Sequence, residues 1–441
     1  MTREEVRGAD TDEAAGPGTP PAGRRLTTRE TAELLGVKPE TVYAYVSRGQ
    51  LSSVRTPGSR GSTFDAAEVE ALVRRTGRME RAAPPPAGRP VIRTGVTLIE
   101  QDRYYYRGVD ATELARRRSF EEVAEFVWTG ELTAGARFAA PHESLAAARR
   151  AVASLPEHSG STDRLRVAVV AAASADPLRF DLSPPGVLNS ARGLIPTMVG
   201  SLPPAGGQPL DDEEDGPLAR RLWPRLSRVP ADTASLTVLG AALSLLADHD
   251  LAASTLAARV AASAHAHPYA VVSAGLGVLE GPLHGAASGL AHRMLTEVVE
   301  RGSAAPVVAD HLRTGRRVPG LGHRLYRGED PRAEVLFGLL AEVPGTAAAA
   351  EAARDVIATT ARHAPLHANV DLALAVLSVS CGMPADAGET VFAVARTVGW
   401  IAHALEEYAE RPLRMRPSGQ YDGPRPPRPF PGPAGRTGFA N

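Results

Sequence analysis

The sequence contains a single cysteine, Cys381, among 441 residues, which excludes an intramolecular disulfide and favours a reducing compartment. Cys381 lies inside an apolar run, so it is predicted to be a core residue rather than a nucleophile. The formal net charge is only -1, which leaves no global attraction to nucleic acid or to a membrane surface. No apolar stretch reaches the length that spans a bilayer, and no signal peptide is recognisable. These absences predict a cytoplasmic protein without a membrane partner.

The chain length predicts two or three domains, and shifts in composition locate their boundaries. Residues 1–25 are rich in glycine, proline, alanine and acidic residues, and we expect a disordered tail. Residues 76–90 include three consecutive prolines and predict a stiff linker. Residues 425–441 are rich in proline and glycine and predict a second, loosely ordered tail. The folded parts are therefore expected to be residues 26–75 and 91–424.

Residues 26–75 show the pattern of two short helices joined at a glycine turn and followed by a third helix. Thr27 and Glu30 form a capping box, and Asp65 caps the third helix. Ala32, Leu34 and Leu35 are predicted to form the buried face of the first helix. The text TTRETAELLGVKPETVYAYVSRGQL resembles small helix-turn-helix domains of the MerR-like and excisionase-like kind. That resemblance implies DNA binding, with candidate residues on or near the recognition helix: Lys38, Thr41, Tyr43 and Arg48.

The charge of this region leaves its role open. Residues 26–75 hold seven basic and six acidic side chains, which is a faint electrostatic footprint for a DNA-binding surface. A small helical module for protein contact is the alternative. The flanking arginines favour DNA, and they are Arg24, Arg25, Arg78 and Arg81.

After the linker, residues 91–100 are predicted to form short strands, and everything that follows is predicted to be helical. Alanine-rich amphipathic segments are expected to be helices at 120–127, 146–154, 163–173, 236–247, 255–264, 286–301, 333–340 and 347–363. No repeat of fixed period is present, which excludes a solenoid.

The most informative stretch is VPGLGHRLYRGEDPR, at residues 318–332. Its proline and glycines predict a loop in which the main chain can approach a ligand closely. His323 ends that loop with a group that titrates near neutral pH, and Arg327 and Arg332 follow as residues that grip carboxylate or phosphate. The pattern indicates a site for a multiply anionic substrate. A solvated basic loop is the alternative.

Two further motifs accompany this stretch. GPLHG, at residues 281–285, sets His284 in a glycine-flanked turn, and NVD, at residues 369–371, opens an apolar run. That run predicts a buried helix with Asp371 at its N-terminus. Other motifs are ADHD and AST within 247–255, ARTVGWIAH at 395–403, RPSGQYDG at 416–423, and YYRGVD with SFEEVAEFVWTGEL between 105 and 132.

In this order and at these spacings, the motifs resemble the citrate synthase family over residues 92–424. The resemblance implies a mainly helical fold in which a large domain contains an inserted small domain, at about residues 286–371. It also implies a homodimer in which Arg416 reaches the site of the partner subunit. The implied reaction joins the methyl carbon of acetyl-CoA to the ketone of oxaloacetate and hydrolyses the thioester to give citrate and CoA.

The resemblance also assigns roles to individual residues. Asp371 would be the base, His284 would donate a hydrogen bond to the thioester oxygen, and His323 would polarise and protonate the ketone. The substrate carboxylates would be held by His249, Arg332, Arg396 and Arg416. Groups for the coenzyme's nucleotide would be Arg327, Pro319, Gly320, Leu321 and Gly322. Arg396 lies in an otherwise apolar helix, which independently favours a ligand role.

No metal or redox cofactor is implied, and acetyl-CoA enters as a co-substrate. His265 and His267 form an H-x-H pair, but with no cysteine or acidic residue close by they are not predicted to bind a metal. Where the family usually has a histidine, three residues before His249, this chain has Leu246. The loss of that polar group is expected to loosen substrate selectivity or to lower activity.

Three hypotheses about function follow. The first is a citrate synthase, and its nearest rival is a 2-methylcitrate synthase that uses propionyl-CoA. The third is a DNA-binding regulator that uses the synthase domain as a metabolite sensor. Retention of His284, His323 and Asp371 together favours an enzyme, because binding alone requires no base.

Overall fold

The computed structural model describes residues 25–35, 37–47, 49–55, 62–75, 92–207, 216–281, 284–285, 287–419 and 421–423. Contacts within the chain divide it into two compact units, residues 1–93 and 94–441, and each is described by itself. The expected tails and the linker at 76–90 lie outside the described residues, apart from Arg25. The predicted domain boundaries stay predictions.

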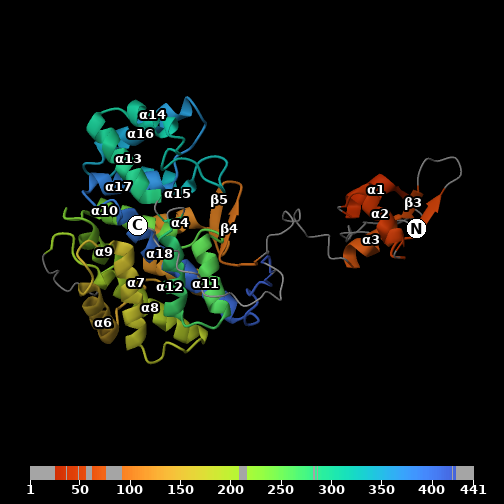
Figure 1. The fold of residues 1–441 in the computed structure, drawn as a ribbon, viewed down its shortest axis with the longest axis horizontal. Coiled ribbons are helices and arrows are strands. Elements are labelled where there is room, and N and C mark those ends of the chain that lie inside the picture. Colours follow the sequence, from red (N-terminus) through yellow and green to blue (C-terminus); the bar gives the residue numbers. More distant parts are fainter. Residues whose placement is uncertain are drawn as a thin grey trace, which may run out of the picture. The chain divides into compact units, whose positions relative to one another are not determined.

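The front unit combines helices with a small antiparallel sheet (Figure 1, red). Its elements are β1 Arg25–Thr27, α1 Thr28–Leu35, α2 Pro39–Ser47, β2 Ser53–Arg55, β3 Ser62–Asp65 and α3 Ala66–Arg75. The sheet order is β1-β3-β2. One apolar cluster packs between the helices and the sheet, and it includes Leu26, Leu35, Val42, Phe64 and Val69.

Both predicted helix caps are present. The Thr27 backbone N–H and hydroxyl donate to Glu30 Oε2 at 2.7 and 2.8 Å, and the Glu30 N–H donates to Thr27 Oγ1 at 3.3 Å. Asp65 Oδ1 accepts from the N–H groups of Ala67 and Glu68, the second and third residues of α3, which have no partner within the helix.

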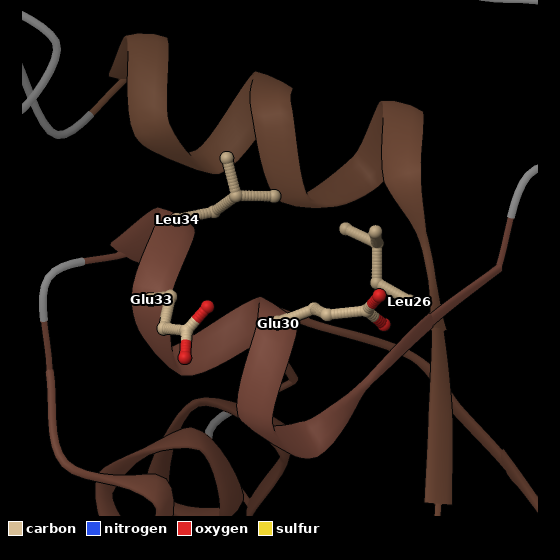
Figure 2. A pocket seen from close by; sticks show the side chains of 4 residues that line it. All are labelled: Leu26, Glu30, Glu33 and Leu34. Carbon is tan, nitrogen blue, oxygen red and sulfur yellow. The ribbon is translucent and has the colours of Figure 1, made fainter.

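The prediction for Leu34 is wrong, because its side chain is 49% exposed while Ala32 and Leu35 are buried. Residues three apart share a helix face, and Leu34 points about a quarter-turn away from that face. Leu34 instead lines an open pocket with Leu26, Glu30 and Glu33 (Figure 2).

The second unit begins with an antiparallel meander rather than with helices alone. Strands β4 Thr97–Glu100, β5 Arg103–Tyr106 and β6 Val109–Asp110 pair in that order. The expectation that strands end at residue 100 is therefore wrong. Gln101 and Asp102, with φ of 51° and 58°, form a tight turn that returns the chain into β5, whose Tyr104 and Tyr106 both face the core.

In its described part, the rest of this unit is helical. The helices are α4 Ala111–Arg117, α5 Phe120–Thr129, α6 His142–Ala153, α7 Ser161–Ala175, α8 Pro184–Ser201, α9 Leu218–Leu226, α10 Thr233–Leu246, α11 Ala253–Ser263, α12 Pro268–Leu279, α13 Ala287–Arg301, α14 Ala304–Arg313, α15 Pro331–Leu340, α16 Ala347–Ala361, α17 Val370–Ser380 and α18 Ala387–Tyr408. The eight amphipathic segments expected to be helical coincide with α5, α6, α7, α10, α11, α13, α15 and α16, which confirms those predictions.

Helix α18 is the central element of the second unit. It packs against α5, α7, α8, α10, α11 and α12, and its Trp400 is fully buried. The indole of Trp400 packs against Gly275 of α12, where an added Cβ would lie only 2.6 Å from the ring. The close approach of α12 to α18 thus requires glycine at position 275.

Figure 1 shows α13, α14 and α16 grouped at one end of this unit, with α6, α7, α8 and α12 toward the other. Helices α10, α15 and α17 lie between the two groups. Cys381 is buried at the end of α17, as predicted, and burial raises the pKa of its thiol to about 11. No helix in the described residues is both long enough and apolar enough to span a membrane.

Candidate active site

The segment after α10, which carries His249, is held in place by the tyrosines of β5. The Tyr104 hydroxyl donates to the carbonyl of Leu245 at 2.9 Å. The Tyr106 hydroxyl lies 2.9 and 3.1 Å from the carbonyls of Ser244 and Asp248. Carbonyls in the last turn of a helix lack the regular intrahelical partner, so the tyrosines add hydrogen bonds at the end of α10 and fix the start of the following loop.

The same segment is bound from the other side by α18. Arg396 Nε donates to the carbonyl of Leu246 at 2.9 Å, and the Gly399 N–H donates to the carbonyl of Ala247 at 2.9 Å. The Leu246 side chain is fully buried in the main core. At this position the structure uses the backbone carbonyl to hold Arg396 and the apolar side chain to fill the core.

His249 is buried and contacts two other aromatic groups of the candidate site. Its Nε2 lies 2.6 Å from the Tyr326 hydroxyl, and its ring meets the His323 ring edge-on with centroids 5.2 Å apart. Burial and the nearby charges of Arg332 and Arg396 lower the pKa of His249 well below its usual value. The imidazole is therefore neutral at pH 7.

The stretch at residues 318–330 is a loop, as predicted, and it is bound to the N-terminus of α17. Gly320 and Gly322 both have φ of +78°, and a Cβ at Gly320 would lie 2.8 Å from the Cβ of Leu372. The Asn369 N–H donates to the Gly320 carbonyl at 2.9 Å, and Asn369 Nδ2 donates to the Gly322 carbonyl at 3.0 Å. The loop that carries His323 and the helix that carries Asp371 are thereby fixed to each other.

His323 is half-buried at the end of this loop, and its tautomer follows from a single bond. The Leu325 N–H donates to His323 Nδ1 at 3.1 Å, so in the neutral ring the proton sits on Nε2. Burial and Arg332 lower the pKa of His323 to about 4. His323 is therefore a neutral hydrogen-bond donor through Nε2 at pH 7.

Arg332 lies almost fully buried in the first turn of α15 and forms a bidentate pair with Asp330. Its Nε and Nη2 lie 2.9 and 2.7 Å from the two Asp330 oxygens. Asp330 Oδ2 also accepts from the Val370 N–H at 3.1 Å. Burial opposes the charge of Asp330, but Arg332 lowers the pKa of this carboxyl below its usual value. The guanidinium faces the Tyr326 ring, with Cζ 5.8 Å from its centroid.

His284 lies between Ser254 and Phe392. Its Nε2 lies 2.8 Å from the Ser254 hydroxyl, and its ring centroid lies 6.2 Å from that of Phe392. The Arg396 guanidinium covers the same phenyl ring at 4.5 Å. Burial and Arg396 lower the pKa of His284, so this histidine too is neutral at pH 7. Residues 282, 283 and 286 of the GPLHG region lie outside the described residues.

Asp371 lies in the first turn of α17, as predicted. Asn369 caps this helix and accepts from the Asp371 N–H at 3.0 Å, while the Ser288 hydroxyl of α13 donates to Asp371 Oδ1 at 2.5 Å. Burial raises the pKa of Asp371, with Ser288 and Arg332 acting in the opposite direction. The carboxylate thus has one oxygen held by a hydrogen bond and an elevated basicity.

The structure brings His249, His323 and Arg332 together around Tyr326. The positive charge of Arg396 acts to lower the pKa of His249 and of His284, and the charge of Arg332 acts to lower the pKa of Asp371. Arg327 and Arg416 are both exposed. Among the described residues, no recorded contact joins Arg416 to this cluster. The roles given to all these residues stay predictions.

The sequence analysis also named candidates for DNA binding and considered a histidine pair for a metal. Lys38, Thr41 and Tyr43 are exposed on or beside α2, while Arg48 lies outside the described residues. His267 caps α12 by accepting from the Ala270 N–H at 3.1 Å. In the described part of the chain, no group of three or more histidine, cysteine or acidic side chains could hold a metal ion.

Sequence reasoning missed several residues that shape the site. Tyr326 and Asp330 lie inside the informative stretch at 318–332, so a search for buried partners of its histidine and arginines would have flagged both. Ser254 lies in the AST motif and Ser288 in no motif, and neither position signals its contact, because they approach His284 and Asp371 from α11 and α13.

Comparison with known proteins finds similar sequences for both units of the chain. The family profile described as "Citrate synthase, C-terminal domain" matches residues 86–418, and "Helix-turn-helix domain" matches residues 25–77. Citrate synthase 2 of Bacillus subtilis is 30% identical over 352 residues, covering 75% of this chain and 93% of the relative. Citrate synthase of Haloferax volcanii is 32% identical over 359 residues, covering 76% of this chain and 93% of the relative.

The fold is also similar to a solved structure. Citrate synthase from Thermotoga maritima superposes with a TM-score of 0.62 at 28% identity, covering 78% of this chain and 96% of that protein. The predicted mainly helical fold is confirmed by this likeness. Because the family profile matches far more than half of the residues, the chain belongs to the citrate synthase family, and a helix-turn-helix domain precedes its synthase domain.

Proposed function

We propose that this chain condenses acetyl-CoA with oxaloacetate and releases citrate and CoA. Membership of the citrate synthase family makes it an enzyme that joins an acyl-CoA to a keto acid, a reaction that needs no permanently bound cofactor. The observation that carries the proposal is the cluster around Tyr326, in which neutral His249 and His323 lie beside the buried Arg332. This combination suits a small substrate with a carboxylate and a polarisable carbonyl oxygen.

In the proposed reaction, Asp371 removes a proton from the methyl group of acetyl-CoA, and the electron pair of the broken C–H bond enters the enolate. The elevated pKa of Asp371 supports this role, because the carboxylate is a stronger base than an exposed aspartate. His284 donates a hydrogen bond to the thioester oxygen, where negative charge develops. A hydroxyl proton of Ser254 directed at Nε2 would keep the imidazole proton on Nδ1 for this purpose.

The enolate carbon then attacks the ketone carbon of oxaloacetate, and His323 transfers its Nε2 proton to the ketone oxygen. Water finally cleaves the thioester and releases the CoA thiol. His249, Arg332 and Arg396 hold the carboxylates of oxaloacetate, which is supported by their burial and by the effect of both arginines on the pKa of His249. The exposed Arg327 and the backbone of residues 319–322 hold the nucleotide of the coenzyme.

Thiol release from acetyl-CoA and oxaloacetate tests this proposal directly. The Asp371→Asn variant keeps the shape of the side chain but removes its basicity, so turnover should fall on the order of a hundredfold or more. Propionyl-CoA in the same assay separates the two synthase hypotheses. A wild-type chain that binds oxaloacetate but releases no thiol from either acyl-CoA would support the sensor hypothesis instead.

We also propose that the enzyme works as a homodimer. Helices α7, α12 and α11 pack in a row, and apolar side chains on the outer helices are exposed: Val170 at 61%, Leu256 at 42% and Val260 at 47%. Between them, Gly277 of α12 opens onto free space with no atom near its ideal Cβ position. A second copy packed on this face would cover the apolar side chains and use the glycine for close helix contact.

In this dimer, Arg416 contributes to the site of the partner subunit, which agrees with its exposed position after α18. Asp371→Asn and Arg416→Ala homodimers should both be poor enzymes. A mixed dimer has one site with both lesions and one site with neither, so mixing the variants should restore up to one working site per dimer. Mixed dimers that are verified by tags and remain as inactive as their parents would rule out the shared site.

The front unit supports a second role in DNA binding, which its helix-turn-helix profile indicates. Lys38, Thr41 and Tyr43 are exposed at α2, where a recognition helix would meet base edges. Affinity of the full chain for DNA should fall steeply with added salt, because phosphate contacts release counterions. A chain that begins at Pro90 should retain thiol release and lose DNA binding. We expect both activities in the cytoplasm, where the buried thiol of Cys381 stays reduced.

A further inference from the structure

One face of α18 holds three successive residues, 246–248, just before His249. The first two carbonyls of this segment accept from Arg396 and Gly399, as described above. The next residue on the same face is His403, seven positions after Arg396 and four after Gly399. His403 Nε2 lies 3.3 Å from Oδ2 of Asp248, the third residue of the segment. Three successive residues of the segment are thus tied to one helix face.

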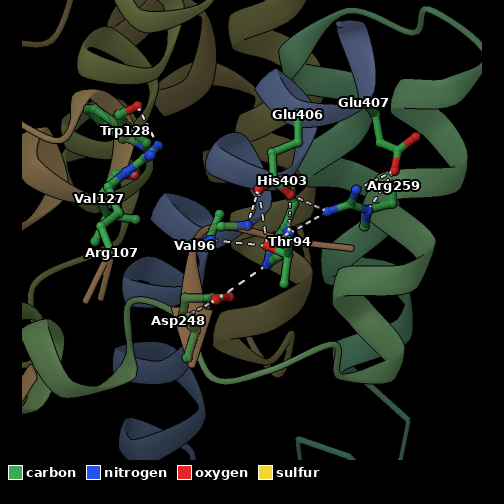
Figure 3. Close-up of polar contacts among 12 residues, drawn as sticks. Thr94, Val96, Arg107, Val127, Trp128, Asp248, Arg259, His403, Glu406 and Glu407 are labelled. Carbon is green, nitrogen blue, oxygen red and sulfur yellow. Dashed lines mark hydrogen bonds and ion pairs between the residues drawn. The ribbon is translucent and has the colours of Figure 1, made fainter. Parts of the chain in front are cut away.

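The hydrogen-bond roles of His403 follow from its other partner (Figure 3). His403 is fully buried, and its Nδ1 lies 2.7 Å from Nη1 of Arg259. A guanidinium has only donors, so Nδ1 accepts this bond and the imidazole proton sits on Nε2, facing Asp248. Burial and the charge of Arg259 oppose a charge on the ring, whereas Asp248 and Glu406 favour it. The short contact with Arg259 requires an acceptor at Nδ1, so the neutral tautomer with its proton on Nε2, facing Asp248, is the one that fits this geometry.

Arg259 is itself immobilised by acidic side chains of α18. Its Nε and Nη1 donate at 2.6 Å to Glu407 Oε1 and Glu406 Oε2, respectively. Glu406 Oε1 accepts from the Gly95 N–H at 2.7 Å, and Arg414 Nε donates to Glu407 Oε2 at 2.9 Å. Hydrogen bonds and the charges around it lower the pKa of Glu406 to about 2, although burial opposes this. Arg259 therefore offers His403 a donor in a fixed position.

Asp248 is the acceptor at the other end, and it is fully buried. Its Oδ2 also accepts from the Thr97 hydroxyl at 2.6 Å. Its Oδ1 has no hydrogen-bond partner among the described residues, and it lies 2.5 Å from the Cβ position that a side chain at Gly399 would take. Burial lowers the pKa of Arg396, and the negative charge of Asp248 acts against this and stabilises the buried guanidinium. Movement of Asp248 would therefore disturb Arg396 as well as the chain leading into the next residue, His249.

We infer that His403 is a positioning residue for the oxaloacetate site. Its Nε2–H holds Asp248, and through Asp248 it fixes the backbone that presents His249 and the counter-charge of Arg396. This inference rests on the proposed function, because it takes oxaloacetate as the substrate bound at His249 and Arg396. His403 itself touches neither substrate nor reacting atoms in this scheme.

Three variants of the full chain test the role of this bond. His403→Gln places an amide donor near the position of Nε2, His403→Asn places one near the position of Nδ1, and His403→Leu has no donor. Loss of a hydrogen bond to the charged Asp248 should let the segment that presents His249 shift, and the KM for oxaloacetate should then rise about tenfold. We expect that rise in the Asn and Leu variants, a KM close to wild type in the Gln variant, and a KM for acetyl-CoA changed less than about twofold in all three.

A control is His292→Leu, which removes a histidine hydrogen bond between two other helices, from half-buried His292 Nδ1 of α13 to Ser378 Oγ of α17 at 2.8 Å. This variant should leave the KM for oxaloacetate unchanged. Oxaloacetate should also raise the unfolding temperature of His403→Asn less than that of wild type. Equal KM values in the Gln and Asn variants, or parallel rises for both substrates, would overturn the inference. Absence of thiol release in wild type would instead refute the proposed function.

Discussion

Removal of the Asp330 carboxylate is the sharpest single perturbation of the site. Arg332 and Asp330 form two bonds of 2.9 and 2.7 Å, and their side chains are only 4% and 1% exposed. Asp330 also accepts from the Val370 N–H at the start of α17. Asp330→Ala leaves a buried guanidinium without its counter-charge and a helix N–H without an acceptor. Breaking a buried pair in this way costs about 3–5 kcal/mol of unfolding free energy.

Denaturant unfolding followed by tryptophan fluorescence measures this loss. All three tryptophans, Trp128, Trp223 and Trp400, are buried in the second unit, so the signal reports that unit. The control is Glu113→Ala, which breaks a 2.7 Å pair with Arg117 whose side chains are 51% and 75% exposed. A surface pair of this kind is worth less than about 1 kcal/mol. Asp330→Asn should fall between the two variants, because its amide oxygen still accepts one bond.

The pH dependence of this difference gives an independent check. Against the effect of burial, Arg332 lowers the pKa of Asp330 in the folded chain, whereas an unfolded aspartate titrates at about 3.9. The stabilisation is therefore complete above about pH 4 and is lost as the pH falls through the folded pKa. The free-energy difference between wild type and Asp330→Asn should stay level from pH 7 to about 4.5 and shrink below. An Asp330→Ala loss no larger than that of Glu113→Ala would refute the reasoning.

Three further predictions concern the same unit. Ser288→Ala removes a bond that lowers the pKa of Asp371, so the acid limb of the kcat/KM profile should move to higher pH; an unmoved limb would contradict the hydrogen bond. Gly320→Ala should lose more unfolding free energy than Gly345→Ala, since both have φ near +78° but only Gly320 meets a neighbouring side chain; equal losses would show that the clash is relieved. His323 binds a proton near pH 6.5 in the unfolded chain but only near pH 4 in the fold, so the unfolding free energy should decrease as the pH is lowered from about 6.5 to 4, and His323→Gln should weaken this dependence.

Much of the local structure was predictable because it depends on neighbours in the chain. The capping box at Thr27, the side-chain cap at Asp65 and the helix start at Asn369 each involve residues two or three positions apart. The glycines at 320 and 322 exclude a helix there and predict the loop that carries His323. The order of the histidine and aspartate motifs predicted the family and hence the mainly helical fold.

Tertiary structure alone decided the partners of those residues. Tyr326 meets His249 across 77 positions of sequence, and Ser288 meets Asp371 across 83. The strand β5 was unpredicted for the same reason, because its tyrosines are needed by the carbonyls that end α10, about 140 residues later. Sequence patterns record which residue types a helix or turn tolerates. The pKa values of buried groups such as His323 and His403 depend instead on charges that only folding brings within a few ångströms.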